Sequence, residues 1–305
     1  MQYIIGIDGG GTKTRLVMTD MQDKLLVTCE AGPSNIHSAP INEVKKVLYT
    51  LIQRALDKTG MNLSQCASVC IGAAGAGRFK ERIILETILN EIGLNGKKTV
   101  TDDVETAFYG GVGCSTGSVI IAGTGSIGFG RNSKGRTHRC GGWGHIIGDE
   151  GSGYDIGKKV ISSVMRSFDG RSPQTIMTKL LLNSLSLSDH NELIQYIYRS
   201  NIGKKEIASL SRVAYEGCAA GDEIAYSIVK NTAEELYLIA TTVLERLGQE
   251  DGLLATGGGV LTHNDYIRNE FKHLLDQSYP KVQVIPMKRD AAWGAAMIAK
   301  EKTEY

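Results

Sequence analysis

Clustered glycine is the feature that most constrains how this chain can fold. The sequence holds 37 glycines against 5 prolines, and many of the glycines stand together in short runs. Glycine has no Cβ, so its backbone can pass very close to a ligand or to another segment. Disordered segments are typically rich in proline as well. The runs therefore predict ordered turns that meet a ligand, and three of them follow predicted strands.

The first run, residues 9–14, directly follows Asp8 at the end of an apolar strand. It resembles a P-loop but lacks the glycine that this motif needs at Thr12, and residues 15–20 have the pattern of a strand rather than a helix. A glycine turn between two strands can still bind phosphate through its backbone N–H groups. A plain hairpin is the alternative, although two residues would suffice for one. Asp8 beside this turn is predicted to hold Mg²⁺ through water.

The second run, residues 123–128, matches the dinucleotide-binding pattern G-x-G-x-x-G. That pattern must open a helix, whereas residues 126–130 have the character of a strand. We therefore expect a second β-turn that mirrors the first. The third run, residues 256–259, lies between a strand and a helix, where backbone N–H groups favour an anion. A tight strand-to-helix turn explains this third run equally well.

Two acidic residues stand where a strand passes into a helix. Asp102 and Asp103 follow the strand 98–101, and either could cap the helix that begins there. Only one cap is needed, which leaves the other carboxylate free to face a ligand. A carboxylate at such a junction can accept the proton of a sugar hydroxyl during phosphoryl transfer.

The segment 140–157 is the most unusual in the chain. It combines several glycines with Trp143, His145, Asp149 and Glu150, a mixture that packing alone does not explain. Carbohydrate sites use carboxylates to bind hydroxyls and an aromatic ring to cover the apolar face of the sugar. The segment therefore predicts a sugar site, in which His145 serves as a structural hydrogen-bonding group.

The predicted elements repeat one order, βββαβα, in the two halves of the chain. The first half has strands at 3–8, 15–20, 25–31, 67–73 and 98–101, with helices at 41–59, at 79–93 and from 102 or 103. The second half has strands at 118–122, 126–130, 135–140, 252–256 and 281–286. Its helices are expected at 150–168, 173–183, 190–198, 203–219, 222–247, 264–277 and 290–301. We expect an α/β fold of two such halves facing a cleft, with a helical insertion in the second half and a boundary near residues 113–117.

The bulk composition excludes several classes of partner. A formal net charge of +1 gives no overall field for nucleic acid or an anionic membrane. The six cysteines are scattered, without a C-x-x-C pair or zinc-ligand spacing. The N-terminus lacks the pattern of a signal peptide, and no apolar run is long enough to span a bilayer. We therefore expect a cytoplasmic protein that binds neither nucleic acid nor a membrane.

Four motifs together resemble the N-acetylglucosamine kinase family of the actin/Hsp70/hexokinase superfamily, and within it the bacterial N-acetylmuramate/N-acetylglucosamine kinases. The motifs lie at residues 8–14, 101–103, 123–126 and 141–152. The last of them, Gly-Trp-Gly-His followed by Gly-Asp-Glu-Gly, is the most specific. The likeness runs from the first strand to the last helix.

The resemblance implies a two-domain organisation and a set of binding partners. It implies two ribonuclease H-like (actin-type) domains around a central cleft: residues 1–115, with the C-terminal helix 290–305 packing back on them, and residues 116–289. It implies a homodimer that phosphorylates the 6-hydroxyl of an N-acetylated amino sugar, a small molecule, with ATP and Mg²⁺. N-acetylglucosamine and N-acetylmuramate are both left open as the substrate.

The resemblance also implies a role for each matched residue. Asp103 would be the general base, and Asp8 would lie at the metal. The nucleotide would contact Gly10, Gly11, Thr12, Lys13, Thr124, Ala208, Gly258 and Gly259. The sugar would contact Asn35, Asp103, Gly125, Ser126, Gly142, Trp143, Gly144 and Asp149.

Two other functions share this type of fold. One is an ATPase that activates a 2-hydroxyacyl-CoA dehydratase or a benzoyl-CoA reductase. Activators of that kind that carry an iron–sulfur cluster ligate it with cysteines at a dimer interface, and residues 72–79 contain no cysteine. The other is a sugar-sensing repressor, which would need a helix-turn-helix extension and, in the related family, a cysteine-rich zinc loop. The activator remains the alternative to the kinase. We do not expect the repressor, because the chain opens on the first strand of the fold and has no such loop.

Overall fold

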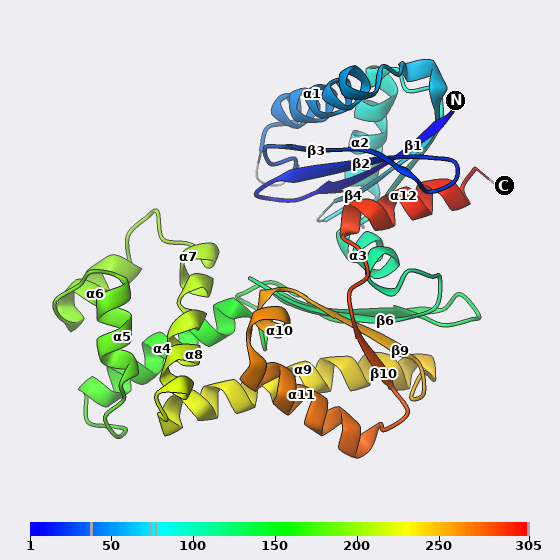
Figure 1. Ribbon diagram of the computed structural model, residues 1–305. Coiled ribbons are helices and arrows are strands. Elements are labelled where there is room, and N and C mark those ends of the chain that lie inside the picture. The colour runs from blue at the N-terminus through cyan, green and yellow to red at the C-terminus, as the bar shows by residue number, and fades with distance from the viewer. Residues whose placement is uncertain (37–38, 74, 77, 304–305) are drawn as a thin grey trace. The chain divides into compact units, whose positions relative to one another are not determined.

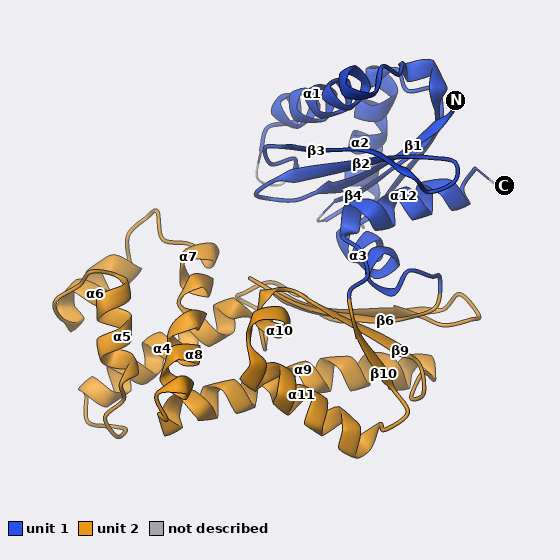
Figure 2. Cartoon of the chain, in the orientation of Figure 1, with its two compact units in different colours: residues 1–115, 287–305 blue, residues 116–286 orange. Residues whose placement is uncertain are grey.

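The computed structural model describes residues 1–36, 39–73, 75–76 and 78–303. The chain divides into two compact units, which are coloured separately in Figure 2. Unit 1 comprises Met1–Ser115 together with Met287–Tyr305, and unit 2 comprises Thr116–Pro286. Among the described residues, no helix is both long enough and apolar enough to cross a membrane.

Unit 1 is built on a five-stranded mixed sheet in the order β3-β2-β1-β4-β5 (Figure 1). Its strands are β1 (Tyr3–Gly9), β2 (Thr14–Asp20), β3 (Leu25–Ala31), β4 (Cys66–Ala73) and β5 (Lys97–Asp102). The first three strands are antiparallel, whereas β4 and β5 run parallel to β1. The central strand β1 is apolar from Tyr3 to Ile7, and its neighbours Ile4 and Ile5, which point to opposite faces, are both fully buried, as is typical of a strand covered on both faces.

Helices cover both faces of this sheet. The helices of unit 1 are α1 (Ile41–Thr59), α2 (Phe79–Ile92), α3 (Asp103–Val112) and α12 (Ala291–Glu301), with a short 3₁₀ turn η1 (Leu63–Gln65). Apolar residues of α1 and α2 join the sheet in one hydrophobic core. The opposite face carries α12, which packs on β1 and α3 (Figure 1).

Glycine allows α12 to pack unusually close to its neighbours. A Cβ on Gly6 of β1 would lie 2.1 Å from the carbonyl oxygen of Ala292, and a Cβ on Gly294 would lie 1.9 Å from that of Thr106. Neither position has space for a methyl group. The N-terminus of α12 is thereby brought next to the carboxyl end of β1.

Unit 2 repeats the same sheet plan in the order β10-β9-β6-β7-β8. Its strands are β6 (Gly117–Ala122), β7 (Ser126–Arg131), β8 (Thr137–Gly141), β9 (Leu253–Gly257) and β10 (Gln283–Pro286). The helices are α4 (Gly153–Phe168), α5 (Met177–Ser184), α6 (His190–Ile197), α7 (Lys204–Ser209), α8 (Ser211–Ala219), α9 (Glu223–Leu247), α10 (Gly259–His263) and α11 (Asp265–Ser278). The long helix α9 packs on β6, β7 and β8. The predicted α/β fold of two βββαβα units is confirmed, with the helical insertion in the second.

The strands that follow the first two glycine runs are also as predicted. Residues after the first run form β2, and those after the second run form β7. Neither run opens a helix, so the first is not a P-loop and the second is not a dinucleotide-binding turn.

One helix prediction was wrong. Residues 203–219 form two helices, α7 and α8, rather than one. At the junction, the N–H of Leu210 donates to the carbonyl of Ile207 at 3.1 Å, and the N–H of Val213 donates to that of Leu210 at 3.0 Å. These contacts span three residues instead of four, which tightens the chain and ends the regular helix.

Candidate active site

Three carboxylates come together in unit 1. Asp8 is the penultimate residue of β1, and Asp103 opens α3. Asp290 caps α12 by accepting a hydrogen bond from the N–H of Trp293 at 2.9 Å. Its second oxygen lies 3.1 Å from Nε of Arg15. Close packing of α12 on β1 therefore places a third acidic group beside the two that the sequence singled out.

The environment of Asp8 disfavours its negative charge. Burial, followed by the charges of Asp103 and Asp290, raises the pKa of Asp8 from 3.8 to about 6, while Lys13 and Arg15 act in the opposite direction. Neighbouring like charges favour a bound cation. The described residues contain no group of three or more His, Cys, Asp or Glu side chains that could hold a metal ion by themselves. Mg²⁺ commonly uses one or two carboxylates together with substrate phosphates and water, and Asp8 fits that role.

Asp103 presents an exposed carboxylate on a well-fixed backbone. Its Oδ1 accepts a hydrogen bond from the N–H of Val104 at 2.9 Å, and its carbonyl accepts one from the hydroxyl of Thr106 at 2.9 Å. Asp102 occupies the N-cap position, but its side chain makes no capping hydrogen bond. A carboxylate fixed at a strand-to-helix junction in this way can receive a proton from a bound hydroxyl.

The first glycine turn joins β1 to β2. The N–H of Gly10 donates to the carbonyl of Lys13 at 3.1 Å, and the N–H of Ser34 donates to the carbonyl of Gly10 at 3.2 Å. Thr12 and Gly11 are exposed. The amide nitrogen of Asn35 lies 3.9 Å from where a Cβ of Gly11 would stand. The structure thus brings Asn35 next to the turn.

Lys13 makes an ion pair outside this turn. Its ammonium lies 3.2 Å from a carboxylate oxygen of Glu30 on β3, and both side chains are largely exposed. Exposed ion pairs contribute little stability and exchange readily. A phosphate would therefore compete with Glu30 for this lysine.

The second glycine turn joins β6 to β7 and is attached to the start of a helix. The N–H of Gly123 donates to the carbonyl of Gly125 at 2.8 Å within the turn. The first N–H groups of α4 donate to the turn from outside, Gly153 to the carbonyl of Gly123 at 2.7 Å and Tyr154 to that of Thr124 at 3.4 Å. These bonds fix the position of the turn against α4.

Unit 2 contains a cavity of about 640 Å³ that collects several predicted nucleotide residues. Thr124, Ala208 and Gly259 come from separate segments and all line it. Six polar residues of the same lining were not predicted from the sequence: Lys205, Ser209, Ser211, Arg212, Tyr215 and His263. Burial raises the pKa of the Tyr215 phenol. Pockets of this size, with an apolar lining and a few polar groups, are typical of small-molecule sites.

Gly258 has a different role from Gly259. Its φ is +83°, and a Cβ there would lie 2.3 Å from the carbonyl oxygen of Ala122. The backbone at this position crosses directly over the end of β6, which only glycine permits. Gly258 thus allows the turn that leads to Gly259.

Asp149 is held by an ion pair that the sequence did not indicate. Its side chain is only 4% exposed, and its Oδ2 lies 2.6 Å from the ammonium of Lys204 at the start of α7. A Cβ on Gly125 would lie 3.1 Å from each of these two groups. The second turn, Asp149 and Lys204 therefore form one cluster, and Asp149 is a neutralised carboxylate rather than an isolated one.

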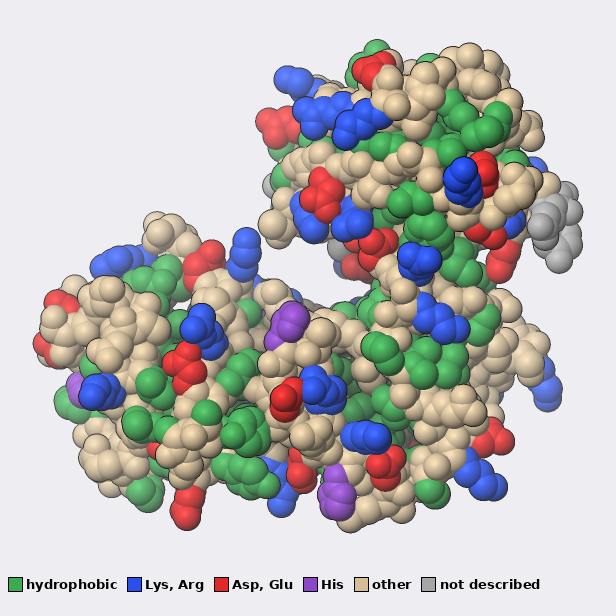
Figure 3. Space-filling view, viewed as in Figure 1, with side chains coloured by type: hydrophobic (Ala, Val, Ile, Leu, Met, Phe, Trp, Pro, Cys, Tyr) green, Lys and Arg blue, Asp and Glu red, His purple; other side chains and the backbone are tan. Residues whose placement is uncertain are grey.

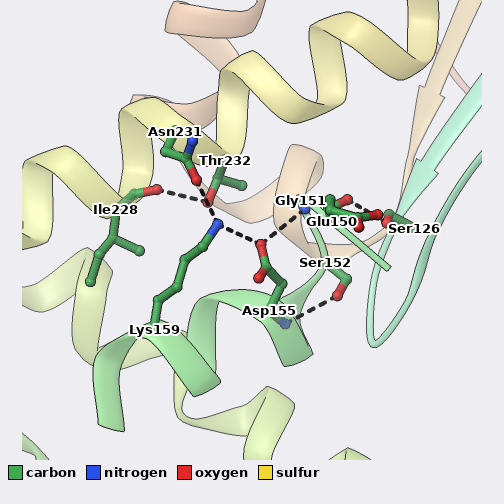
Figure 4. A network of polar contacts seen from close by, with 9 residues as sticks. All are labelled: Ser126, Glu150, Gly151, Ser152, Asp155, Lys159, Ile228, Asn231 and Thr232. Atoms are coloured by element: carbon green, nitrogen blue, oxygen red, sulfur yellow. Dashed lines mark hydrogen bonds and ion pairs between the residues drawn. The ribbon is translucent and has the colours of Figure 1, made fainter. Parts of the chain in front are cut away.

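The loop that follows Asp149 is fixed by polar contacts (Figure 4). The hydroxyl of Ser126 donates to the carbonyl of Glu150 at 2.5 Å, so its proton is engaged within the protein. The N–H of Gly151 donates to Oδ2 of Asp155 at 3.2 Å. These bonds attach the loop to β7 on one side and to α4 on the other.

Lys159 extends this network to the long helix α9. Its ammonium lies 2.7 Å from Oδ2 of Asp155 and donates to Oδ1 of Asn231 at 2.6 Å (Figure 4). One cation therefore connects α4 and α9 through two hydrogen bonds. The network holds the backbone that carries Asp149.

The predicted aromatic residue stands on an exposed loop after β8. Trp143 is 61% exposed, and its N–H donates to the carbonyl of Gly148 at 3.1 Å. Gly142 and Gly144 have φ values of +70° and +91°, which glycine adopts readily. The guanidinium of Arg139 lies 5.0 Å from the centre of the Trp143 ring.

Surface charge offers no alternative site on the face shown in Figure 3. Lysine and arginine side chains there are interspersed with aspartate and glutamate rather than gathered in one patch. This agrees with the formal net charge of +1. A surface of mixed sign provides no extended field for a polyanion.

Two five-stranded mixed sheets of the same order define the fold of the actin-like ATPases. The chain belongs to the BadF/BadG/BcrA/BcrD ATPase family, and the match to that family spans residues 5–299.

Individual relatives are similar over their whole length. The chain is 46% identical over 306 residues to the N-acetylmuramic acid/N-acetylglucosamine kinase of Clostridium acetobutylicum, with 100% of both chains covered. It is 31% identical over 311 residues to the N-acetyl-D-glucosamine kinase of Dictyostelium discoideum, with 98% of each covered. Among solved structures, a candidate N-acetylglucosamine kinase from Chromobacterium violaceum has a TM-score of 0.79 at 22% identity, covering 98% of this chain and 99% of that one. The last likeness establishes the fold alone.

Proposed function

We propose that the chain is an ATP-dependent kinase that phosphorylates the 6-hydroxyl of an N-acetylated amino sugar, N-acetylglucosamine or N-acetylmuramate. The observation that carries the proposal is the full-length likeness, at 46% identity, to a relative named as a kinase of both sugars. The exposed carboxylate of Asp103 and the small-molecule cavity of unit 2 are compatible with it.

Asp103 is the proposed general base. The sugar 6-oxygen attacks the γ-phosphorus of ATP, the bond from that phosphorus to the bridging oxygen breaks, and ADP leaves with the electron pair. The proton of the hydroxyl passes to the carboxylate of Asp103. Phosphoryl transfer needs little covalent help from a protein, so positioning and a base account for most of what the chain must supply.

Asp8 is the proposed residue for Mg²⁺. When bound, the ion would neutralise charge on the phosphates. Asp8 itself would hold the ion or one of its waters, aided by the local excess of negative charge from Asp103 and Asp290.

The remaining roles follow the predicted residues. The β1–β2 turn with Gly10, Gly11, Thr12 and Lys13 would bind phosphates through its backbone and the lysine. The unit 2 cavity lined by Thr124, Ala208 and Gly259 would take the nucleoside, with Gly258 supporting its wall. Asn35, Gly125, Ser126, Gly142, Trp143, Gly144 and Asp149 would contact the sugar.

We further propose that the two units are the two actin-type domains, and that the protein is a cytoplasmic homodimer. The domains and the dimer come from the family resemblance, and the cytoplasmic location comes from the sequence pattern of the N-terminus and the absence of a long apolar run. Light scattering on the purified protein tests the dimer, and a monomer at micromolar concentration would contradict it.

An ATPase that activates a dehydratase or reductase is not favoured. The two relatives above 30% identity both carry kinase names. Of the six cysteines, all of which lie in the described part of the chain, only Cys114 is exposed. An activator would hydrolyse ATP without a sugar.

A coupled assay of ADP release across a panel of sugars tests the proposed function. Purified protein with ATP and Mg²⁺ is expected to release ADP only when N-acetylglucosamine or N-acetylmuramate is present. Glucose and glucosamine serve as comparisons that lack the acetyl group. ADP release that is independent of any sugar would contradict the proposal and support the activator.

A further inference from the structure

Arg139 is a cation fixed against the predicted sugar residues of unit 2. It lies on β8, where its Nε donates to the carbonyl of Gly141 at 3.3 Å and its Nη2 donates to the carbonyl of Gly142. Its guanidinium also lies 5.0 Å from the centre of the Trp143 ring. Two backbone acceptors and an aromatic face therefore hold this side chain in one orientation.

The charge of Arg139 has no carboxylate partner among the described residues. Two other cations near the predicted sugar residues are neutralised, Lys204 by Asp149 at 2.6 Å and Lys159 by Asp155 at 2.7 Å. The guanidinium has five N–H groups in a planar fork. The two backbone carbonyls leave the others available on an exposed side chain.

A ligand that fits this arrangement combines a carboxylate with a small apolar group. The guanidinium fork matches a carboxylate in geometry and charge. The exposed ring of Trp143 offers an apolar surface directly beneath it. An acidic ether on a sugar that is bound by Gly142 and Trp143 would present both groups, as the lactyl ether of N-acetylmuramate does with its carboxylate and methyl.

We propose that Arg139 recognises the carboxylate of an amino sugar that carries an acidic ether, and so determines the preference for N-acetylmuramate over N-acetylglucosamine. This assignment rests on the proposed function. Arg139 is a specificity-determining residue and takes no part in the phosphoryl transfer.

Steady-state kinetics of Arg139→Gln and Arg139→Lys with both sugars test the assignment. Hydrogen bonds to a charged group predict a roughly 10- to 100-fold loss of kcat/KM for N-acetylmuramate in Arg139→Gln. The value for N-acetylglucosamine should stay within about threefold, because that sugar has no carboxylate to lose. Arg139→Lys keeps the charge without the fork and should fall between the wild type and Arg139→Gln.

Two controls separate charge recognition from other effects. Arg136→Gln removes the same charge from an exposed residue in the turn before β8 and should leave the ratio of the two sugars unchanged. The methyl ester of N-acetylmuramate lacks the negative charge. Wild-type protein should prefer the acid to the ester, whereas Arg139→Gln should treat them alike.

Each remaining outcome overturns a stated part of the account. An equal loss for both sugars in Arg139→Gln would show that Arg139 only supports the hairpin. A changed ratio in Arg136→Gln would show a long-range effect of charge. A wild type that phosphorylates N-acetylglucosamine but not N-acetylmuramate would overturn this inference and leave the proposed function intact. A wild type that phosphorylates neither sugar would overturn the proposed function.

Discussion

The two units place a glycine turn between their first two strands, but the surroundings of the two turns differ in charge. Near the unit 1 turn, Asp8 meets Asp103 and Asp290, and its pKa is raised to about 6. Near the unit 2 turn, the buried carboxylate of Asp149 is paired with Lys204 at 2.6 Å. Asp8 therefore lies among like charges, whereas Asp149 faces a cation.

This difference shows how two sheets of the same strand order can support two kinds of chemistry. Neighbouring like charges raise the proton affinity of a carboxylate and favour a bound cation. Groups that only bind a neutral sugar or a nucleoside need a fixed orientation, which an ion pair and a helix N-terminus provide. Under the proposed function, unit 1 supplies the base and the metal site, and unit 2 supplies the binding surfaces.

The largest expected effect concerns Asp103, one of the like charges that act on Asp8. Asp103→Asn should lower the turnover of amino-sugar phosphorylation by a factor of about 10² to 10⁴, because the amide cannot accept the proton. Sugar affinity, measured by calorimetry, should remain within about threefold. Asp102→Asn is the matched control, since its side chain makes no capping hydrogen bond, and it should keep near-normal turnover. If both variants lose activity equally, the charge of Asp103 has no special role.

The next effect compares glycines of the two units. Gly258→Ala places a methyl group 2.3 Å from the carbonyl oxygen of Ala122 at a φ of +83°, and should lower the free energy of unfolding by about 3 kcal/mol. Gly11→Ala in unit 1 meets only the Asn35 amide at 3.9 Å and should cost less than about 1 kcal/mol. Urea denaturation measures both. Equal losses would contradict the close packing over β6.

A third effect uses pH to detect the like charges around Asp8. The folded chain holds a proton on Asp8 up to pH of about 6, whereas the unfolded chain loses it near 3.8. Ionisation of Asp8 therefore costs stability that grows as the pH rises from about 4 to 6 and is constant above that. Asp8→Asn in metal-free buffer should raise the free energy of unfolding by about 3 kcal/mol at pH 8.

The pH dependence of this stabilisation shows whether the raised pKa of Asp8 is its cause. The difference between Asp8→Asn and wild type should be near zero at pH 4 and reach its plateau above pH 6. Asp290→Asn removes one of the like charges that raise the pKa of Asp8. When Asp8→Asn is added to Asp290→Asn, the gain in the free energy of unfolding above pH 6 should therefore be smaller than in the wild type. A difference that does not change with pH would contradict the assignment.

The smallest effect concerns two adjacent lysines of unit 2. Lys204→Met leaves the buried carboxylate of Asp149 without its partner, and should raise the KM for sugar by about tenfold. Lys205→Met changes a residue of the cavity lining and should raise the KM for ATP instead. Initial rates with each substrate varied in turn measure both. If the two variants affect the same substrate, the cavity and the ion pair do not serve different ligands.

The fold could be predicted because it depends on local sequence patterns that occur in both halves of the chain. Apolar runs such as residues 3–8 and 118–122 become the central strands β1 and β6, since burial on both faces selects continuous apolar sequence. The helix at 41–59 was predicted with its observed bounds. The break at Leu210 was not, because it comes from a local change in hydrogen bonding and no glycine or proline marks it.

The site could be predicted only in part, because its ion pairs join distant positions. Local motifs led to Asp8, Asp103 and Asp149. Lys204 is 55 positions from Asp149, and no sequence pattern marks it as a partner. Asp290 did leave a signal, since an aspartate directly before an alanine-rich helix is typical of an N-cap. Its proximity to Asp8 follows from the packing of α12, which depends on the whole of unit 1.

The central claim is that the chain moves phosphate from ATP to the 6-oxygen of an N-acetylated amino sugar. Nuclear magnetic resonance of the product after incubation with ATP, Mg²⁺ and N-acetylglucosamine tests it most directly. The account predicts phosphorus coupled to the two protons on carbon 6, with one ADP formed for each sugar phosphate. Phosphate on the anomeric oxygen, or ADP and free phosphate with unchanged sugar, would contradict it.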